Sequence, residues 1–184
     1  MNIEIIAGSP RRDSVSFRVA LHLQQQLTQT TSHLVNIIDV RDWAFPLLQE
    51  VIDSPESAPE HLVSLAGRMF AADAFILVTP EYNGTYTAAL KNLLDHFPKQ
   101  SHKAFGVVTA SPGAMGGMRS SQQLLLLIAA LFGVACPNML IVPGVEKKFD
   151  AEGQLIDPGF AKSVEIFLRE WHWLAEALYA MKER

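Results

Sequence analysis

Serine and arginine side chains gather near the amino terminus, directly after the apolar residues 3–7. The next nine residues, 8–16, hold Ser9, Arg11, Arg12, Ser14 and Ser16. Hydroxyls, guanidinium groups and the free backbone N–H groups of a starting helix are the donors that bind phosphate in proteins. A serine-capped helix with solvated arginines explains the same residues. This segment alone therefore leaves a phosphate site and an ordinary helix cap both open.

Two further loops carry residue types suited to a flat ligand. Residues 79–86 read Thr-Pro-Glu-Tyr-Asn-Gly-Thr-Tyr, which combines aromatic rings, an amide and a flexible glycine. Residues 111–119 contain Gly113, Gly116 and Gly117, which allow the backbone to approach a ligand closely. A polar turn and a flexible connection are the competing structural interpretations. Neither loop decides the question by itself.

Several phosphate chemistries are excluded by the same residues. Gly8 is the only glycine before residue 67, so the first loop matches neither G-x-x-x-x-G-K-[ST] nor G-x-G-x-x-G. The single cysteine, Cys136, lies far from this loop and offers it no nucleophile. It also excludes an intramolecular disulfide, and we expect it to be a small buried hydrophobe.

Short apolar runs alternate with helical patterns along the chain. We expect strands at residues 3–7, 34–39, 74–79, 104–110 and 133–142, and helices at 16–29, 59–71, 87–96, 117–132 and 159–182. Such alternation predicts an α/β fold with a doubly wound, five-stranded parallel sheet in three α/β/α layers. Ligands bind such sheets beyond the carboxyl ends of the strands, where the three loops are expected. Residues 45–59 are expected to be a surface loop, and residues 143–158 a short hairpin or a flap.

Composition sets further limits. The chain has 184 residues, of which 49% are hydrophobic, and a formal net charge of -4 with scattered basic residues. We expect a single domain over residues 1–184, in the cytoplasm, with no nucleic-acid partner. The longest apolar stretch, 124–136, is shorter than the roughly 20 residues that span a bilayer, so no membrane association is expected.

The three loops together resemble those of the NADPH-dependent FMN reductase family of flavodoxin-like proteins. The family pattern G-S-x-R-x-x-S is matched at residues 8–14, P-E-Y-N at 80–83 and L-K-N at 90–92, followed by Asp95 and by the glycine pair Gly116-Gly117. Residues 39–47 are similar to the segment that follows the second strand in that family. The resemblance runs from residue 3 to about residue 145.

That resemblance implies bound FMN, with NADPH or NADH as co-substrate and a small molecule such as a flavin, quinone, azo or nitro compound or metal oxyanion as electron acceptor. It places the FMN phosphate at Ser9, Arg11, Ser14, Ser16 and the amide of Phe17. The flavin and ribityl chain would contact Pro80, Glu81, Tyr82, Asn83, Ser111, Gly113, Gly116 and Gly117. The chain departs from the family in three places: Ser16 is often Asn there, residues 85–87 are Thr-Tyr-Thr where S-x-P is common, and Leu125 is often Arg.

The resemblance also implies a homodimer or homotetramer. We expect apolar surface for it along helix 90–97 and at Met115 and Met118. The arginine that is absent at position 125 puts a family-type charge network at that interface in doubt.

Hydride transfer on a flavin requires no catalytic side chain, and none is predicted. Asp95 and His96 are adjacent on a helix, so they do not face each other, and we expect both to point toward solvent. The remaining histidines have no metal-ligand spacing, so no metal is expected. The roles of Arg12, at the NADPH 2′-phosphate or in solvent, stay open. The main alternative is a flavodoxin-like electron carrier that binds FMN without oxidising nicotinamides, and a second is a scaffold that has lost FMN.

Overall fold

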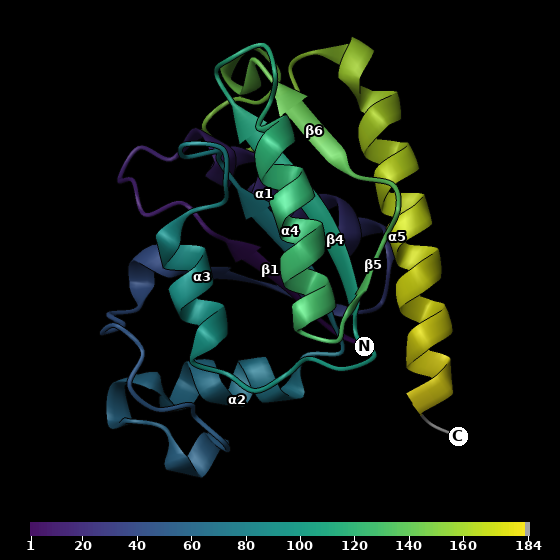
Figure 1. Cartoon of the computed structure of the whole chain (residues 1–184). Helices are drawn as coiled ribbons and strands as arrows, with labels where there is room; N and C mark the ends of the chain where they lie inside the picture. Colours follow the sequence, from purple (N-terminus) through teal and green to yellow (C-terminus); the bar gives the residue numbers. More distant parts are fainter. Residues whose placement is uncertain (183–184) are drawn as a thin grey trace.

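The computed structural model describes residues 1–182, which form one parallel sheet with helices on both faces (Figure 1). The strands are β1 (Asn2–Ala7), β2 (Leu34–Asp39), β3 (Ala74–Thr79), β4 (Ala104–Ser111), β5 (Val134–Ala135) and β6 (Leu140–Pro143). The α-helices are α1 (Val15–Thr30), α2 (Val63–Ala71), α3 (Ala88–Asp95), α4 (Met118–Ala130) and α5 (Ala161–Lys182). Short 3₁₀ turns occupy Val40–Asp42, Pro55–Ser57, Glu60–Leu62, Val145–Lys147 and Pro158–Phe160.

The strand order is β2-β1-β3-β4-β5, and every pairing is parallel. The chain starts in the middle of the sheet, moves outward to β2, and then crosses back to β3 and β4 on the other side. This reversal on either side of β1 is the doubly wound arrangement that the sequence predicts. It leaves the loops after β1 and β3 next to each other at one end of the sheet, with the amino terminus at the opposite end (Figure 1).

Side chains alternate between the two faces of the central strands, which makes two apolar layers. In β3, Ile76 and Val78 face the layer that α1 and α5 cover, whereas Phe75 and Leu77 face the layer that contains residues of α2, α3 and α4. All four are buried. Both faces of a parallel sheet must be covered in this way, which explains the continuous apolar runs in the sequence.

The prediction of one continuous fifth strand over residues 133–142 is wrong. It consists of β5, which pairs with Ala104 and Phe105 of β4, and β6, which pairs with residues 108–111 of the same strand. Between them Cys136 still donates its amide to the Phe105 carbonyl at 2.8 Å. Pro137 has no N–H to continue the ladder, so the strand breaks there. Cys136 is fully buried, as expected.

The helices begin where capping side chains allow. Ser14 accepts the amide of Phe17 at the start of α1, and Thr87 accepts the amide of Leu90 at the start of α3. The second helix begins at Val63 rather than at residue 59, because residues 60–62 form a 3₁₀ turn. No helix within the described residues is both long enough and apolar enough to cross a membrane.

Candidate functional site

A cavity of about 330 Å³ lies where the loops after β1, β3 and β4 meet. Of the residues expected at a cofactor site, those lining it are Ser9, Arg11, Ser14, Ser16, Pro80, Glu81, Tyr82 and Ser111. The cavity is also lined by Asp13, Val15, Ala110, Pro112 and Glu146. The fold therefore brings four separate segments of the sequence together, namely residues 9–16, 80–82, 110–112 and Glu146.

The first loop forms a donor-rich wall of the cavity at the start of α1. The Ser14 hydroxyl lies 3.1 Å from that of Ser16 and also accepts the Phe17 amide at 3.3 Å. Among the described residues, no protein acceptor is recorded for the amides of Val15 and Ser16, which belong to the first helical turn. Ser14 can therefore cap α1 through the Phe17 amide while the amides of Val15 and Ser16 remain available to bind an anion. The Phe17 amide is used by the cap, and Phe17 does not line the cavity.

Arg41 and Asp39 hold this loop in place from the end of β2. The guanidinium of Arg41 donates to the Arg12 carbonyl at 2.7 Å and to Asp39 at 2.9 Å, and it lies over the ring of Phe17. The hydrogen bond to Asp39 raises the pKa of Arg41 above its usual value. Sequence reasoning noted this segment but gave these two residues no role. The sequence does carry a signal for this pair: an acidic residue ends a strand, and a basic residue follows it two positions later.

The second loop is a tight turn that presents Tyr82 to the cavity. Tyr82 and Thr85 exchange backbone hydrogen bonds of 2.9 and 3.2 Å. Asn83 and Gly84 between them have φ angles of 52° and 87°, as a type I′ turn requires. Asn83 therefore shapes the turn and does not line the cavity. The guanidinium of Arg11 lies 5.2 Å from the centre of the Tyr82 ring, so the first two loops are in contact.

The hydroxyl of Tyr82 is buried and has no hydrogen-bond partner among residues 1–182. Leaving such a group unpaired costs on the order of 1–3 kcal/mol, so a partner from a ligand would be stabilising. Together with the unpaired amides of α1, this hydroxyl fits a ligand that carries both an anionic group and further polar atoms. The residues present therefore fit a flavin mononucleotide.

Glu81 connects the second loop with the third. Its carboxylate accepts the amides of Arg119 at 3.0 Å and of Ser120 at 3.4 Å, and it pairs with the Arg119 guanidinium at 3.3 Å. These amides belong to the first turn of α4, whose N-cap residue, Gly117, has no side chain to satisfy them. Glu81 therefore supplies the missing cap.

The glycine pair of the third loop is required by packing beneath the cavity. Gly116 and Gly117 have φ angles of 59° and 86°. A Cβ at Gly116 would lie 2.7 Å from the Pro143 nitrogen, and one at Gly117 would lie 2.9 Å from the Cβ of Thr109. The carbonyl of Gly113 accepts the Gly116 amide at 3.3 Å. None of these three glycines lines the cavity.

The segment after β6 is a hairpin that brings Glu146 to the cavity. Phe149 and Leu155 pair as an antiparallel bridge, and Ile156 donates to the Lys148 carbonyl at 2.8 Å. Asp13 and Glu146 place two carboxylates at the same cavity as Arg11. Sequence reasoning missed both residues, because an exposed carboxylate and a distant hairpin give no local signal.

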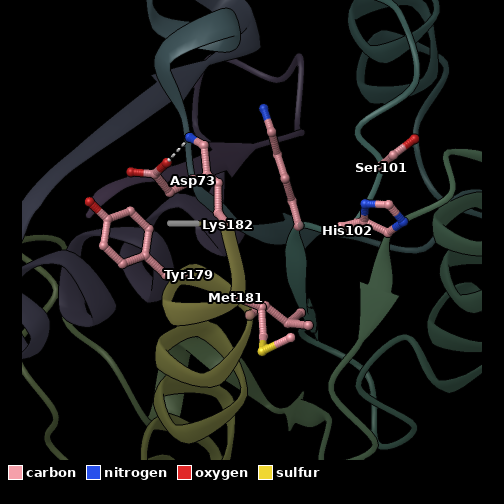
Figure 2. A pocket seen from close by; sticks show the side chains of 8 residues that line it. Asp73, Ser101, His102, Tyr179, Met181 and Lys182 are labelled. Atoms are coloured by element: carbon pink, nitrogen blue, oxygen red, sulfur yellow. Dashed lines mark hydrogen bonds and ion pairs between the residues drawn. The ribbon is translucent and has the colours of Figure 1, made fainter. Parts of the chain in front are cut away.

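A second cavity, of about 430 Å³, lies at the other end of the sheet and includes none of the expected site residues. Figure 2 shows Lys182 of α5 directed at Asp73, with the two groups 2.8 Å apart. Burial, and to a lesser extent the charge of Lys182, lowers the pKa of the neighbouring Lys103 to about 8. Because it is remote from the three loops, this cavity does not compete with them as the cofactor site.

Two expectations about individual side chains are wrong. His96 is buried against Phe45 and bonds to the Asn92 carbonyl at 2.7 Å instead of pointing toward solvent. The apolar side chains of helix 90–97 lie in the core, whereas Met115 and Met118 are exposed as expected. The sequence spacing of the histidines does not reveal that the fold brings the His33 Nε2 to within 3.1 Å of the His172 Nε2.

Comparison with known proteins identifies the family and the fold of the chain. The chain is 29% identical over 164 residues to a quinone reductase from Pseudomonas putida, covering 85% of each chain. It is 27% identical over 178 residues to a probable NADPH:quinone oxidoreductase from Oryza sativa, covering 91% of this chain and 85% of the relative. A flavoenzyme NAD(P)H:(acceptor) oxidoreductase, FerB from Paracoccus denitrificans, has a similar structure, with a TM-score of 0.77 and 21% identity over 95% and 97% of the two chains.

That likeness confirms the predicted flavodoxin-like α/β fold. Residues 1–147 match the family model for NADPH-dependent FMN reductases, and this range contains all three loops of the cavity. The chain therefore belongs to the NADPH-dependent FMN reductase family, as its loop motifs predict.

Proposed function

We propose that the cavity binds FMN with its phosphate at the start of α1, and that the protein transfers electrons from NADPH or NADH to a quinone or a similar small acceptor. The quinone reductases among its relatives support this acceptor class. The observation that carries the proposal is the convergence of unpaired α1 amides, serine hydroxyls and Arg11 at one cavity. FMN held there would supply the redox chemistry, namely hydride transfer from the nicotinamide and delivery of two electrons to the acceptor.

Ser9, Arg11, Ser14 and Ser16 would bind the phosphate, with the amides of the first helical turn. The amino end of a helix carries about half a positive elementary charge, which favours a dianion. Asp13 and Glu146 line the same cavity and oppose that charge, so the guanidinium of Arg11 has to offset them. This makes Arg11 the residue whose loss should matter most for affinity.

The second and third loops would hold the ring and the ribityl chain. Tyr82 and Ser111 line the cavity directly, beside Pro80 and Pro112. Glu81 acts through its bonds to α4, and Asn83 through the turn that presents Tyr82. Gly116 and Gly117 permit the close packing that fixes the third loop, and the Gly113 carbonyl accepts the Gly116 amide. These residues bind and orient the cofactor, and none is assigned to proton transfer.

The whole chain would act as a single FMN-binding domain in the cytoplasm, without nucleic-acid or membrane partners. A homodimer or homotetramer would cover the apolar side chains exposed on α4, where Met118 is 42% and Leu126 66% exposed. Adding such a surface to an interface is favourable because it removes apolar area from water.

The competing function is a flavodoxin-like carrier, which would bind FMN and leave nicotinamides unoxidised. The deciding experiment loads the purified protein with FMN and mixes it anaerobically with NADPH or NADH. We expect the flavin absorbance to bleach, and to recover when a quinone is added. Bound FMN that neither nucleotide bleaches would establish the carrier function. A protein that takes up no FMN would overturn the cavity assignment itself.

A further inference from the structure

Three side chains with metal-binding atoms meet on the face of the sheet covered by α1 and α5. His33 lies between α1 and β2, whereas His172 and Glu176 are four residues apart on α5. The His33 Nε2 is 3.1 Å from the His172 Nε2 and 2.8 Å from the Glu176 Oε1. The remaining pair, His172 Nε2 and Glu176 Oε1, is 3.4 Å apart. The three atoms thus form a nearly equilateral triangle.

That triangle has the size of one face of a tetrahedral zinc site. Zinc bonds of 2.0–2.1 Å to nitrogen and oxygen place tetrahedral ligand atoms about 3.3 Å from one another. The observed separations of 2.8, 3.1 and 3.4 Å lie close to this value. Among the described residues, this is the one group of three His, Cys, Asp or Glu side chains whose ligand atoms all lie within 4.8 Å of one another.

The donor set selects the kind of metal. Two imidazole nitrogens and one carboxylate oxygen suit Zn²⁺ and its transition-metal neighbours, whereas Mg²⁺ and Ca²⁺ require mostly oxygen ligands. The two neutral imidazoles and the carboxylate carry one negative charge, which favours a dication. We propose that His33, His172 and Glu176 form a binding site for a zinc-type divalent metal ion, with its fourth position open to water or another ligand.

The surroundings of the site allow an ion to enter and be held. The side chain of His33 is 15% exposed and that of Glu176 is 50% exposed, so the triangle is reached from solvent at its carboxylate. The His33 Nδ1 lies 3.4 Å from the amino group of Met1. A metal on Nε2 leaves the imidazole proton on Nδ1, so the amino group of Met1 has to turn away from the ring when the ion binds.

A metal here would join two segments that are distant in the sequence. It would connect the segment between α1 and β2 to the second half of α5, and both helices pack on the same apolar layer. The site lies away from the loops that line the FMN cavity, and no residue is shared between them. The expected effect is therefore on the stability of α5 against the sheet, with the flavin chemistry unaffected. The proposal does not depend on the proposed function.

Zinc titration tests the proposal directly. We expect isothermal titration of the purified full-length protein with zinc sulfate to show one ion bound per chain, undisturbed by millimolar Mg²⁺. His172→Ala and Glu176→Gln should each weaken zinc binding on the order of tenfold or more, because losing a ligand costs more than losing a second-shell partner. His61→Ala, at an exposed histidine outside the cluster, serves as the matched control and should bind zinc normally.

Thermal unfolding provides the second measurement. Zinc at 100 times its dissociation constant should raise the melting temperature of the wild type by roughly 5–10 °C, and that of His172→Ala much less. The variants must retain the circular dichroism of the wild type. If His172→Ala unfolds, Glu176→Gln still tests the site, because it removes the charge but keeps the size of a half-exposed side chain. Equal zinc binding by the wild type and both variants, or no binding by the wild type, would show that the cluster is only a hydrogen-bonded group.

Discussion

The carboxylate of Glu81 accepts the backbone amide of Arg119, so the turn after β3 is bonded to the first turn of α4. Replacing Glu81 with Ala removes a helix cap and should lower the free energy of unfolding by about 0.5–2 kcal/mol. FMN affinity should fall too, because Tyr82 follows directly in the same turn. Urea unfolding and flavin titration measure the two effects.

Arg119→Ala is the control for that prediction. The amide of Arg119 remains in this variant, and its side chain is 66% exposed. Exposed ion pairs contribute about 0–1 kcal/mol, so this change should have a small effect on stability. Equal losses in the two variants would mean that the side-chain pair, and not the cap, joins the loops.

Arg11→Ala should weaken FMN binding by about 1.5–3 kcal/mol, the range for a hydrogen bond to a charged group. Arg12→Ala tests the neighbouring guanidinium. Within the described part of the chain, Arg12 is bonded through its carbonyl, which accepts from Arg41, and its side chain makes no hydrogen bond. That carbonyl survives the substitution, so FMN affinity should stay within about threefold of wild type. Fluorescence titration of the apoprotein with FMN compares the two. If FMN affinity falls more in Arg12→Ala than in Arg11→Ala, Arg12 and not Arg11 binds the phosphate.

Gly117→Ala should be strongly destabilising, whereas Gly67→Ala should stabilise the protein. At Gly117 a left-handed backbone conformation, costing about 1–2 kcal/mol for alanine, coincides with a Cβ contact of 2.9 Å to Thr109. Gly67 lies within α2 with nothing within 4 Å of a Cβ, so alanine should gain about 0.5–1 kcal/mol. Chemical denaturation of both variants checks the pair, and a neutral Gly117→Ala would contradict the packing role.

Lys103 should make the protein's stability depend on pH. Its pKa in the folded protein is about 8, below the usual 10.5, mainly because burial disfavours the charged amine. The unfolded chain therefore binds more protons between these values, and the cost of the buried charge is present below pH 8 and disappears as the pH rises toward 10.5.

Lys103→Met removes that cost at neutral pH. Its stability relative to wild type should therefore fall between pH 7 and pH 10.5, by on the order of 1 kcal/mol after allowing for partial solvent exposure. Lys147→Met, at an exposed position, is the matched control and should show no such change. Urea unfolding at the two pH values measures the difference. A relative stability of Lys103→Met that stays constant with pH would contradict the assignment.

Glu4 in β1 and Arg68 in α2 form a largely buried ion pair, with Glu4 only 2% exposed and the closest atoms 2.6 Å apart. Arg68→Ala leaves the carboxylate unpaired inside the protein and should cost about 3–5 kcal/mol. The double variant Glu4→Leu with Arg68→Met removes both charges and should recover most of that loss. Thermal or urea unfolding compares them, and a double variant as unstable as Arg68→Ala would argue against an electrostatic origin.

The sequence predicts the order of the strands and helices well, because alternating burial leaves continuous apolar runs such as residues 74–79. The break in the last strand was missed, because the apolar residues continue on both sides of Pro137. The predicted start of a helix differs from the observed one by a few residues where a 3₁₀ turn precedes the helix, as at Glu60–Leu62. These are local hydrogen-bonding details that periodicity does not encode.

At the candidate site, sequence motifs identified the loops better than the roles within them. Ser9, Arg11 and Tyr82 line the cavity. Glu81 lines it too, but its carboxylate is bonded to α4, and the glycine pair lies outside the lining and holds the third loop in place. A motif is the same whether its residues touch a ligand or support a neighbour. Contacts made only through the fold, such as Glu146 at the cavity or His33 beside His172, have no signature within a short window of sequence.

Gly106 of β4 faces α5, where a Cβ would lie 2.9 Å from the Trp171 ring and 3.0 Å from Phe167. The fully buried Trp171 thus fits only because one strand residue lacks a side chain. Trp171 lies beyond the segment that matches the family, and Gly106 lies within it. The carboxy-terminal segment of this chain therefore cannot be transferred freely between relatives. In a relative with a larger residue at the position of Gly106, that side chain would hold α5 away from the sheet.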